Sequence, residues 1–357
     1  MNQTKQPEKI FILRNNDLGD VLVATPLVRG LRESFPTAKI ALGVGNWASP
    51  LLENNPDLDE VVNCNAPWHN KQNCRFPANS PRTFLEGLIY ILLSKEARYL
   101  TRQRHTHAID VLGSRQGSWL LRRACIPNRY GIRGYAGGDN WCDGCVDFRE
   151  DRKVAETGLA FLELLGAKVE IEPRPRIFLT DREKQEAENR WGERKSESKR
   201  IIIAPGGGFP EKCWGDQNYS ELIKLLLNEP SYQLCIIGSN EDRDRITAET
   251  WNSQDLRVRN MCGNLSLRQS AALVAKSDFV LSNTSLCMHL AGAFRIPSII
   301  LLGPWYESAK LHADQWGYPE GKVLGREVSE GQFSVLSSAQ AYKTFSKLIV
   351  GGNDTPR

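Results

Sequence analysis

The sequence predicts an α/β protein made of two domains, each a doubly wound parallel sheet with helices on both faces. Three observations lead to this prediction. The 357 residues exceed an ordinary single domain and suit two domains of typical size. Short apolar runs alternate with helix-like segments in both halves of the chain, a pattern typical of parallel sheets. A highly charged segment at 180–198 (TDREKQEAENRWGERKSES) separates the two halves.

The first half is read as alternating strands, helices and two long loops. Apolar runs predict strands at 10–13, 39–43, 60–64 and 107–112. Thr25 and Pro26 are typical of an N-cap and the first residue of a helix. The segment 83–98 is helix-like, whereas 64–81 and 131–147 are rich in turn-forming residues and are predicted to be loops.

The second half repeats this rhythm. Strands are predicted at 200–204, 233–237, 279–281 and 298–302. The segment 216–227 is an amphipathic helix whose apolar face carries Tyr219, Leu222, Ile223 and Leu226. Ser266 is expected to cap a helix that ends at Ala275.

Four segments follow from this reading. They are an N-terminal domain at 1–178, a charged helical connector at 179–198, a C-terminal domain at 199–335 and a last helix within 336–357.

Composition and charge restrict the class of protein. The net charge is +4, with no extended basic tail and no recognisable nucleic-acid module, so nucleic acid is not an expected partner. No apolar run reaches the roughly 18 residues of a membrane-spanning helix. The N-terminal segment is polar, unlike a secretory signal, so we expect a cytoplasmic protein. The segment 95–133 holds nine Lys/Arg and two acidic residues. It is read either as a contact for an anionic membrane surface or as a solvated face.

Nine cysteines are scattered along the chain, and their odd number favours free thiols over a disulfide framework. Cys142 and Cys145 form a lone CxxC pair. Together with Cys64 and Cys74 they could supply four thiolates to a zinc ion, but the spacing of the second pair is unusual. Free thiols are therefore the favoured interpretation, and no metal or cofactor is predicted.

A candidate catalytic carboxylate follows the first strand. The run Leu18-Gly19-Asp20 is predicted to form a turn between the first strand and the next helix, so Asp20 lies at the carboxyl edge of the sheet, where ligands of open α/β sheets bind. A capping role for Asp20 is the alternative. We expect Arg14 and Gly19 to belong to the same turn.

Residues 14–36 (RNNDLGDVLVATPLVRGLRESFP) and residues 282–304 (SNTSLCMHLAGAFRIPSIILLGP) carry a resemblance to a known family. The first stretch is similar to the opening strand, LGD turn and TP helix of glycosyltransferase family 9, the lipopolysaccharide heptosyltransferases, and the second is similar to that family's second motif. The resemblance implies the GT-B fold, with two Rossmann-like domains facing across a cleft. It implies that the domain at 1–178, with Arg14 and Gly19, binds the acceptor, that the domain at 199–335 binds the nucleotide sugar, and that the last helix packs back on the first domain. It also implies inverting, metal-independent transfer from ADP-heptose to a lipid-linked core sugar, with domain closure during catalysis.

Several residues of the second half are candidate donor ligands. Gly207 and Gly208 lie in a glycine run after a strand, where backbone N–H groups can approach a phosphate; a simple flexible turn is the alternative. Lys212, before Trp214, matches a lysine that contacts the donor in the resembling family. The resemblance also assigns an acidic residue to the nucleoside, for which Glu241 is preferred over Asp242. The turn that includes Leu265 is expected to border the adenine.

The second motif places further candidates at a helix start. The helix N-terminus after Asn283, Thr284 and Ser285 could bind a diphosphate, and His289 matches a Met-His pair of the resembling family. A packed histidine is the alternative for His289. Thr284 and Leu286 replace the family's usual aspartate and glycine, so the donor sugar and the activity itself stay open.

Three other functions are alternatives to heptose transfer. Residues 43–48 fit G-x-G-x-x-A, but the motif follows the second strand rather than the first, which disfavours a dinucleotide site. Transfer from another nucleotide sugar is an alternative that suits the altered loop. A non-catalytic sugar-nucleotide-binding protein is the alternative from a different class.

Overall fold

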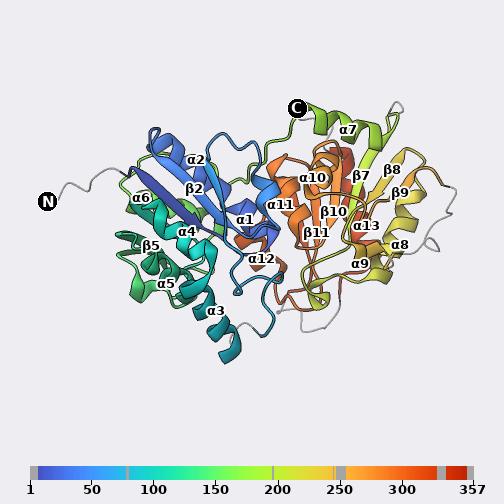
Figure 1. Cartoon of the computed structure of the whole chain (residues 1–357). Coiled ribbons are helices and arrows are strands. Elements are labelled where there is room, and N and C mark those ends of the chain that lie inside the picture. The colour runs from blue at the N-terminus through green and yellow to red at the C-terminus, as the bar shows by residue number, and fades with distance from the viewer. Residues whose placement is uncertain are drawn as a thin grey trace. The chain divides into compact units, whose positions relative to one another are not determined.

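The computed structural model describes residues 7–77, 80–194, 197–243, 245–246, 255–327 and 335–351. The chain forms two compact units, Met1–Phe178 and Leu179–Arg357, coloured blue to green and green to red in Figure 1. Each unit holds one six-stranded parallel sheet flanked by helices. The predicted α/β class with two doubly wound sheets is confirmed.

Unit 1 has the sheet order β3-β2-β1-β4-β5-β6. Its strands are β1 (Lys9–Leu13), β2 (Lys39–Val44), β3 (Glu60–Asn63), β4 (His107–Asp110), β5 (Asn128–Arg133) and β6 (Gly144–Asp147). Its helices are α1 (Leu18–Val23), α2 (Thr25–Ser34), α3 (Pro81–Leu93), α4 (Lys95–Gln103), α5 (Arg115–Arg123) and α6 (Val154–Leu164), with short turns η1 (Ser49–Leu52) and η2 (Asp139–Trp141). The chain therefore builds outwards from β1 in one direction and restarts at β4 on the other side.

The central strand of unit 1 is covered on both faces. Ile10 and Ile12 belong to one core cluster, together with apolar residues of α1, α2 and α6. Phe11 and Leu13 belong to a second cluster, with residues of α3, α4 and α5. Because successive side chains of a strand point to opposite faces, a continuous apolar strand requires two covering layers.

Unit 2 has the order β12-β11-β10-β7-β8-β9, the same winding as unit 1. Its strands are β7 (Lys199–Ala204), β8 (Tyr232–Ile236), β9 (Val258–Asn260), β10 (Phe279–Ser282), β11 (Ser298–Leu301) and β12 (Gly321–Leu324). Its helices are α7 (Asp181–Trp191), α8 (Asp216–Leu227), α9 (Asn240–Arg243), α10 (Leu267–Ala275), α11 (Leu286–Ala293), α12 (Ala309–Trp316) and α13 (Ser338–Gly351), with the turn η3 (Pro210–Lys212).

Two predicted helices of unit 2 are confirmed in their details. α8 has the predicted bounds and buries Tyr219, Leu222, Ile223 and Leu226 on one face. Ser266 caps α10 through a capping box, in which its hydroxyl accepts from the Gln269 N–H and the Gln269 side chain accepts from the Ser266 N–H.

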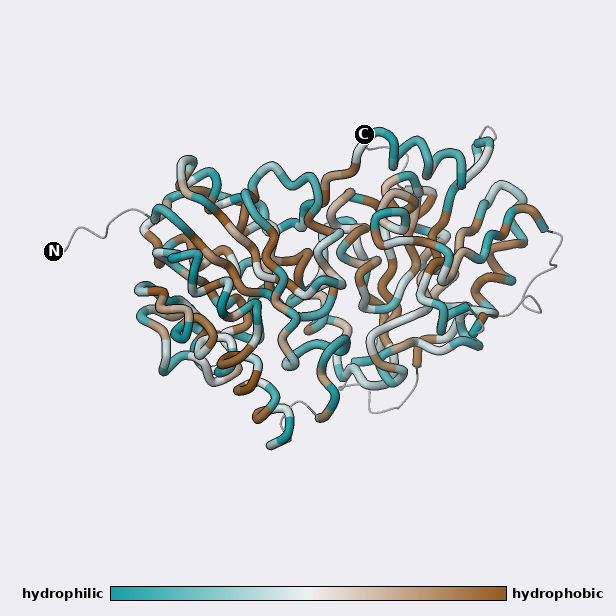
Figure 2. The backbone as a smooth tube through the Cα atoms, viewed as in Figure 1, coloured by the Kyte–Doolittle hydropathy of each residue, from teal (hydrophilic) through white to brown (hydrophobic). Residues whose placement is uncertain are grey.

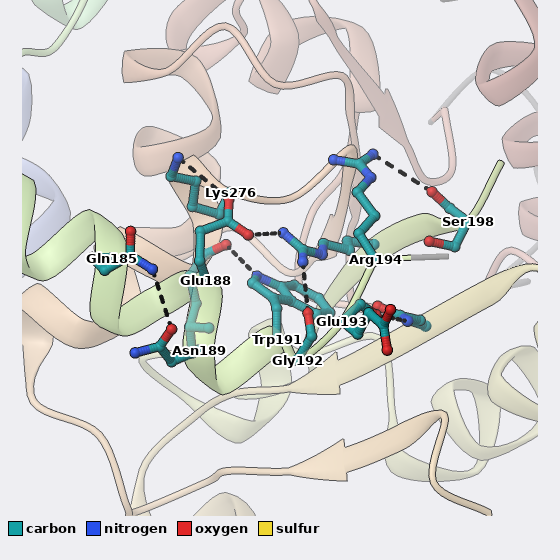
Figure 3. Close-up of polar contacts among 12 residues, drawn as sticks. Gln185, Glu188, Asn189, Trp191, Gly192, Glu193, Arg194, Ser198 and Lys276 are labelled. Carbon is teal, nitrogen blue, oxygen red and sulfur yellow. Dashed lines mark hydrogen bonds and ion pairs between the residues drawn. The ribbon is translucent and has the colours of Figure 1, made fainter. Parts of the chain in front are cut away.

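The charged connector contains a helix that is docked on unit 2. α7 is mostly hydrophilic (Figure 2), but it contacts α10 and buries Trp191, whose indole N–H donates to the Leu273 carbonyl at 3.1 Å. Glu188 forms an ion pair with Arg200 at 2.5 Å and another with Lys276 at 3.3 Å. Figure 3 shows the pair with Lys276. α7 is thus fixed to this unit by a buried ring and two ion pairs.

Three predictions about local structure in unit 1 are wrong. The segment 83–98 holds two helices, because the Ser94 hydroxyl caps a new helix by accepting from the Ala97 N–H at 3.0 Å. The segment 131–147, expected to be a loop, contains the end of β5 and all of β6. Thr25 does not cap α2: it is the first helical residue, and its hydroxyl donates to the Leu22 carbonyl at 2.7 Å.

The last helix, α13, packs into the core of unit 2. Ala341, Phe345 and Ile349 of α13 belong to the same core cluster as the unit 2 strands. The Phe345 ring lies 4.9 Å from that of Phe279, in edge-on contact. The apolar period of α13 carries no information about which core it joins, so the sequence could not separate the two.

We predict that Phe345→Ala destabilises unit 2 by about 3–5 kcal/mol, the usual cost of removing a buried phenylalanine. Urea unfolding followed by tryptophan fluorescence measures this, with Lys347→Ala on the same helix as the control. Lys347 is exposed, so its replacement should change the free energy of unfolding by less than about 0.5 kcal/mol. Equal stabilities of the two variants would contradict the packing of α13 in this core.

Candidate functional site

The sheet order of each unit creates one position where a ligand site is expected. Strand order reverses between β1 and β4 in unit 1 and between β7 and β10 in unit 2. Loops that leave the carboxyl ends of two such strands diverge, and ligands of open α/β sheets bind in the crevice between them. The sequence-predicted residues fall after β1, β7, β8, β9 and β10.

In unit 1, Asp20 is held by an arginine at the end of β1. The Arg14 guanidinium donates through Nη2 to Asp20 Oδ1 at 2.7 Å and through Nε to the Asp20 carbonyl at 3.3 Å. The Arg14 side chain is 5% exposed and that of Asp20 30% exposed. The buried Arg14 cation therefore orients the Asp20 carboxylate, which is still accessible to solvent.

The LGD run is helical, which corrects the predicted turn. Leu18, Gly19 and Asp20 are the first three residues of α1, and the N-cap is Asp17, which makes no side-chain capping bond. Asp20 therefore does not cap this helix. Gly19 is half-buried beside it.

The loop after β3 covers the residues that follow β1. The Asn15 side chain donates to the Trp68 carbonyl at 3.3 Å, and the Asn16 side chain donates to the His69 carbonyl at 2.9 Å. Burial, and secondly the Arg14 cation, lower the pKa of His69. A neutral imidazole at this edge leaves Arg14 and Asp20 as the charged pair.

A second carboxylate, not singled out from the sequence, lies at the end of β4. Asp110 is fully buried and accepts from the backbone N–H groups of Leu112 at 3.1 Å and Ser114 at 2.9 Å. A Cβ on Gly117 would lie 2.1 Å from its Oδ2. Burial raises the pKa of Asp110 to about 6. Because its oxygens are committed to the β4–α5 turn, Asp20 is the accessible carboxylate of the two.

In unit 2, the loops after β7 and β10 are joined by Asn283. Its side-chain oxygen accepts from the Trp214 N–H at 3.0 Å and from the Tyr219 hydroxyl at 3.1 Å. Its amide N–H₂ donates to the carbonyls of Pro205 and Gly206. Asn283 was a candidate donor ligand, but it is fully buried and its amide is used within the fold.

The glycine run after β7 packs closely against its neighbours. A Cβ on Gly206 would lie 2.3 Å from Asp242 Oδ2, and one on Gly207 would lie 2.8 Å from Cys213 Sγ. Gly207 and Gly208 are exposed, so their backbone faces solvent at the end of the sheet. Gly206 and Gly207 therefore leave no room for a side chain unless a neighbour moves, whether or not the run binds an anion.

The structure separates the two acidic candidates after β8. Asp242 is buried and accepts from the Ser239 N–H at 2.7 Å and from the Ser239 hydroxyl at 2.8 Å. Glu241 is exposed in the first turn of α9, and within the described part of the chain its carboxylate has no hydrogen bond or ion pair. Glu241 is therefore the one available to a ligand.

Lys212 lies among aromatic rings that sequence reasoning missed. Its Nζ is 4.2 Å from the centroid of the Trp305 ring and 5.1 Å from that of Phe209. The loop after β11 is tied to this segment, because the N–H groups of Gly303 and Trp305 donate to the carbonyls of Lys212 and Glu211, each at 3.2 Å. The glycine-proline pair at 303–304 was the one sequence signal that marked this loop.

Thr284 belongs to a hydroxyl and imidazole cluster. Its Oγ1 lies 2.8 Å from His312 Nε2, and the Tyr306 hydroxyl also interacts with it. Burial, with the nearby His289 and Lys212, lowers the pKa of His312 to about 4. A neutral imidazole thus holds the threonine that stands where the resembling family has an aspartate. Ser285 is the N-cap of α11 and forms no side-chain capping bond.

His289 and Leu265 make no hydrogen bond to Thr284 or His312 among the described residues. His289 is buried, its Nδ1 lies 2.8 Å from the Tyr318 hydroxyl, and burial lowers its pKa to about 4. This is the packed alternative. Leu265 is half-buried beside Gly263, whose φ of +70° and close approach to Asn240 exclude a side chain there.

The cysteines are free thiols in this structure. Across the described ranges, no group of three or more His, Cys, Asp or Glu residues is placed to hold a metal ion. Cys142 and Cys145 interact with one another, and burial is the main cause that raises the pKa of each. No described helix is both long enough and apolar enough to cross a membrane.

Comparison with known proteins identifies the family of this chain. The model of glycosyltransferase family 9 (heptosyltransferase) matches residues 94–309. Lipopolysaccharide heptosyltransferase 2 of Escherichia coli K12 is 26% identical over 311 residues, covering 83% of each chain.

Solved structures share the fold. The structure of E. coli ADP-heptose lps heptosyltransferase II has a TM-score of 0.73 at 22% identity, covering 96% of this chain and 99% of that one. The structure of E. coli heptosyltransferase WaaC with ADP-2-deoxy-2-fluoro heptose has a TM-score of 0.70 at 16% identity, covering 95% and 99%. With more than half of its length matched by the family model, the chain belongs to glycosyltransferase family 9 and is a glycosyltransferase.

Proposed function

We propose that the protein is an inverting, metal-independent glycosyltransferase that moves heptose from ADP-heptose to a lipopolysaccharide-core-like glycolipid. The observation that carries the proposal is the Arg14–Asp20 pair, an accessible and oriented carboxylate at the carboxyl end of β1 in a family 9 member. The donor follows from relatives named as heptosyltransferases and from the related structure that holds an ADP-heptose analogue.

The acceptor side of the reaction is assigned to unit 1. Inversion is one in-line displacement, so it needs a base for the acceptor hydroxyl and no covalent nucleophile. Asp20 takes the hydroxyl proton while Arg14 holds its other oxygen in place. The acceptor oxygen then bonds to the anomeric carbon as the bond from that carbon to the diphosphate oxygen breaks.

The donor side is assigned to unit 2. The departing ADP gains negative charge, which Lys212 and the N-terminus of α11 stabilise. The exposed backbone of Gly207 and Gly208 and the hydroxyls of Thr284 and Ser285 complete the diphosphate site, and Glu241 and Leu265 take the nucleoside. Asn283 and His289 act by positioning the loop and α11 rather than by touching the donor.

A second candidate is transfer from a different nucleotide sugar. It is favoured by Thr284, whose hydroxyl is committed to His312 at a position where the family uses a free carboxylate, and by the bulk of Leu286. The same two residues also favour a non-catalytic sugar-nucleotide-binding protein, the alternative from a different class. The accessible Asp20 argues against that last reading.

The location of the enzyme follows from its proposed partners. A nucleotide-sugar donor and a lipid-linked acceptor meet at the inner face of the cytoplasmic membrane, so we propose a cytoplasmic enzyme in peripheral contact with that surface. Nucleic acid has no part in the proposal.

Thermal stability against a panel of ADP-, UDP- and GDP-sugars tests the donor. A ligand at 100 times its Kd adds about 2.7 kcal/mol of stability, which is readily measured as a raised Tm. Stabilisation by ADP-heptose supports heptose transfer. Stabilisation by another sugar nucleotide alone moves the function to the second candidate, and no stabilisation by any of them points to a lost donor site.

Asp20→Asn should lower kcat by about 10²- to 10⁴-fold with little change in donor affinity, because asparagine keeps the bond to Arg14 but cannot take a proton. Steady-state transfer and donor titration measure the two quantities. Asp147→Asn, another arginine-paired carboxylate, is the matched control and should retain full activity. Lost donor binding, or an unchanged kcat, would contradict the assignment of Asp20 as the base.

Lys212→Met should weaken donor binding by about 10- to 100-fold, the loss expected for one charged hydrogen bond to a phosphate. Methionine keeps an aliphatic stem against Trp305 and Phe209, so the change isolates the charge. Isothermal titration with the nucleotide sugar measures the affinity, and Lys224→Met on the exposed face of α8 is the control. Equal affinities in the two variants would remove Lys212 from the donor site.

A further inference from the structure

The helix α3 presents an apolar face to solvent. Leu85, Ile89, Leu92 and Leu93 are 57%, 50%, 55% and 67% exposed. They recur at spacings of three and four residues and so form one continuous stripe, called here the α3 stripe. The opposite face of the same helix carries the buried Thr83, Gly87 and Ile91.

This arrangement is the reverse of an ordinary surface helix. A helix that borders water normally buries its apolar side and exposes its polar side. Brown segments lie along α3 in Figure 2, at the place that Figure 1 labels. Single exposed leucines need no explanation, but a contiguous stripe of large aliphatic side chains marks a surface that meets an apolar partner.

Basic side chains adjoin the α3 stripe. α4 begins one residue after α3 ends, and its exposed residues include Lys95, Arg98 and Arg102. Arg82 is exposed in the first turn of α3. Within the described ranges none of these four cations forms an ion pair. The acidic residues of the two helices, Glu86 and Glu96, are half-buried.

We propose that the α3 stripe and the basic face of α4 dock on the anionic surface of a lipid bilayer. Aliphatic side chains enter the boundary between headgroups and acyl chains, while unpaired lysine and arginine contact lipid phosphates. Charge complementarity selects this occupant, because a second copy of the same face would bring like charges together. The inference deepens the proposed glycolipid acceptor and assigns the membrane contact to named residues.

The two parts of the surface should contribute separately to binding. Removing two exposed cations should lower vesicle partitioning about 25-fold, since each is worth about fivefold near an anionic surface. Replacing two aliphatic side chains of the α3 stripe by serine should lower partitioning by roughly tenfold or more, because these side chains enter the bilayer on binding. Salt should weaken the charge-dependent part and leave the apolar part.

Co-sedimentation of the full-length protein with vesicles measures this. One set of vesicles is phosphatidylcholine alone and the other also contains phosphatidylglycerol; neither holds donor or acceptor. Leu85→Ser/Ile89→Ser is compared with Leu164→Ser/Leu256→Ser, exposed leucines elsewhere. Arg98→Gln/Arg102→Gln is compared with Lys343→Gln/Lys347→Gln, exposed cations on α13. All substituted side chains are exposed, so the fold should persist, and urea midpoints check this.

The proposal is supported if the wild type and both controls bind phosphatidylglycerol vesicles and both surface variants lose binding. It is overturned if the wild type does not bind, or if the surface variants bind as well as their controls. Self-association that Leu85→Ser/Ile89→Ser abolishes, without vesicle binding, would overturn it in favour of a dimer interface. The vesicles hold no substrate, so the two proposals can fail separately. Vesicle binding without transferase activity would support this inference and contradict the proposed function. Transferase activity without vesicle binding would support the proposed function and overturn this inference.

Discussion

The buried side-chain amide of Asn283 is the interaction on which the geometry of unit 2 depends. It accepts from the Trp214 N–H and the Tyr219 hydroxyl, and it donates to the carbonyls of Pro205 and Gly206. Through these bonds the loop after β10 is locked to the loop after β7 and to the start of α8. A buried group of this kind costs about 1–3 kcal/mol for each partner left unpaired, so the network resists substitution. Lys212 precedes Trp214 by two residues, and its position therefore follows from an amide whose four hydrogen bonds lie within the fold.

The parts of the fold that were predicted correctly are those with a local signal. α8 was predicted to the residue because its apolar spacing is helical throughout, and α10 because a serine and a glutamine form a capping box. β1–β4, β7, β8, β10 and β11 were found as short apolar runs, and their alternation with helices gave parallel sheets; β5, β9 and β12 were not predicted. α1 was missed because a helix of six residues is too short for its apolar spacing to be recognised. β6 was missed because its glycine and cysteine interrupt the apolar pattern of a strand.

The candidate site was predictable only where a residue follows a strand end. Asp20, Lys212 and Glu241 were placed at the carboxyl edges of the sheets because each follows a strand, and the family resemblance singled out Lys212 and an acidic residue after β8. Trp305 contacts Lys212 from about 90 residues further along the chain. His312 contacts Thr284 from 28 residues further along. No local sequence pattern records such contacts. For the same reason the sequence could not distinguish Asp242, which is consumed by packing against Gly206, from the exposed Glu241 beside it.

The position of α13 has a consequence for how the chain matures during synthesis. All residues of unit 1 have been made once the ribosome passes Phe178, so this unit can fold while the rest is still emerging. The core of unit 2 instead needs Ala341, Phe345 and Ile349, and the Trp214 indole donates to the Leu336 carbonyl at 2.7 Å. A nascent chain that stops before this helix leaves the rings of Phe279 and Tyr232 uncovered, a surface that chaperones and proteases recognise.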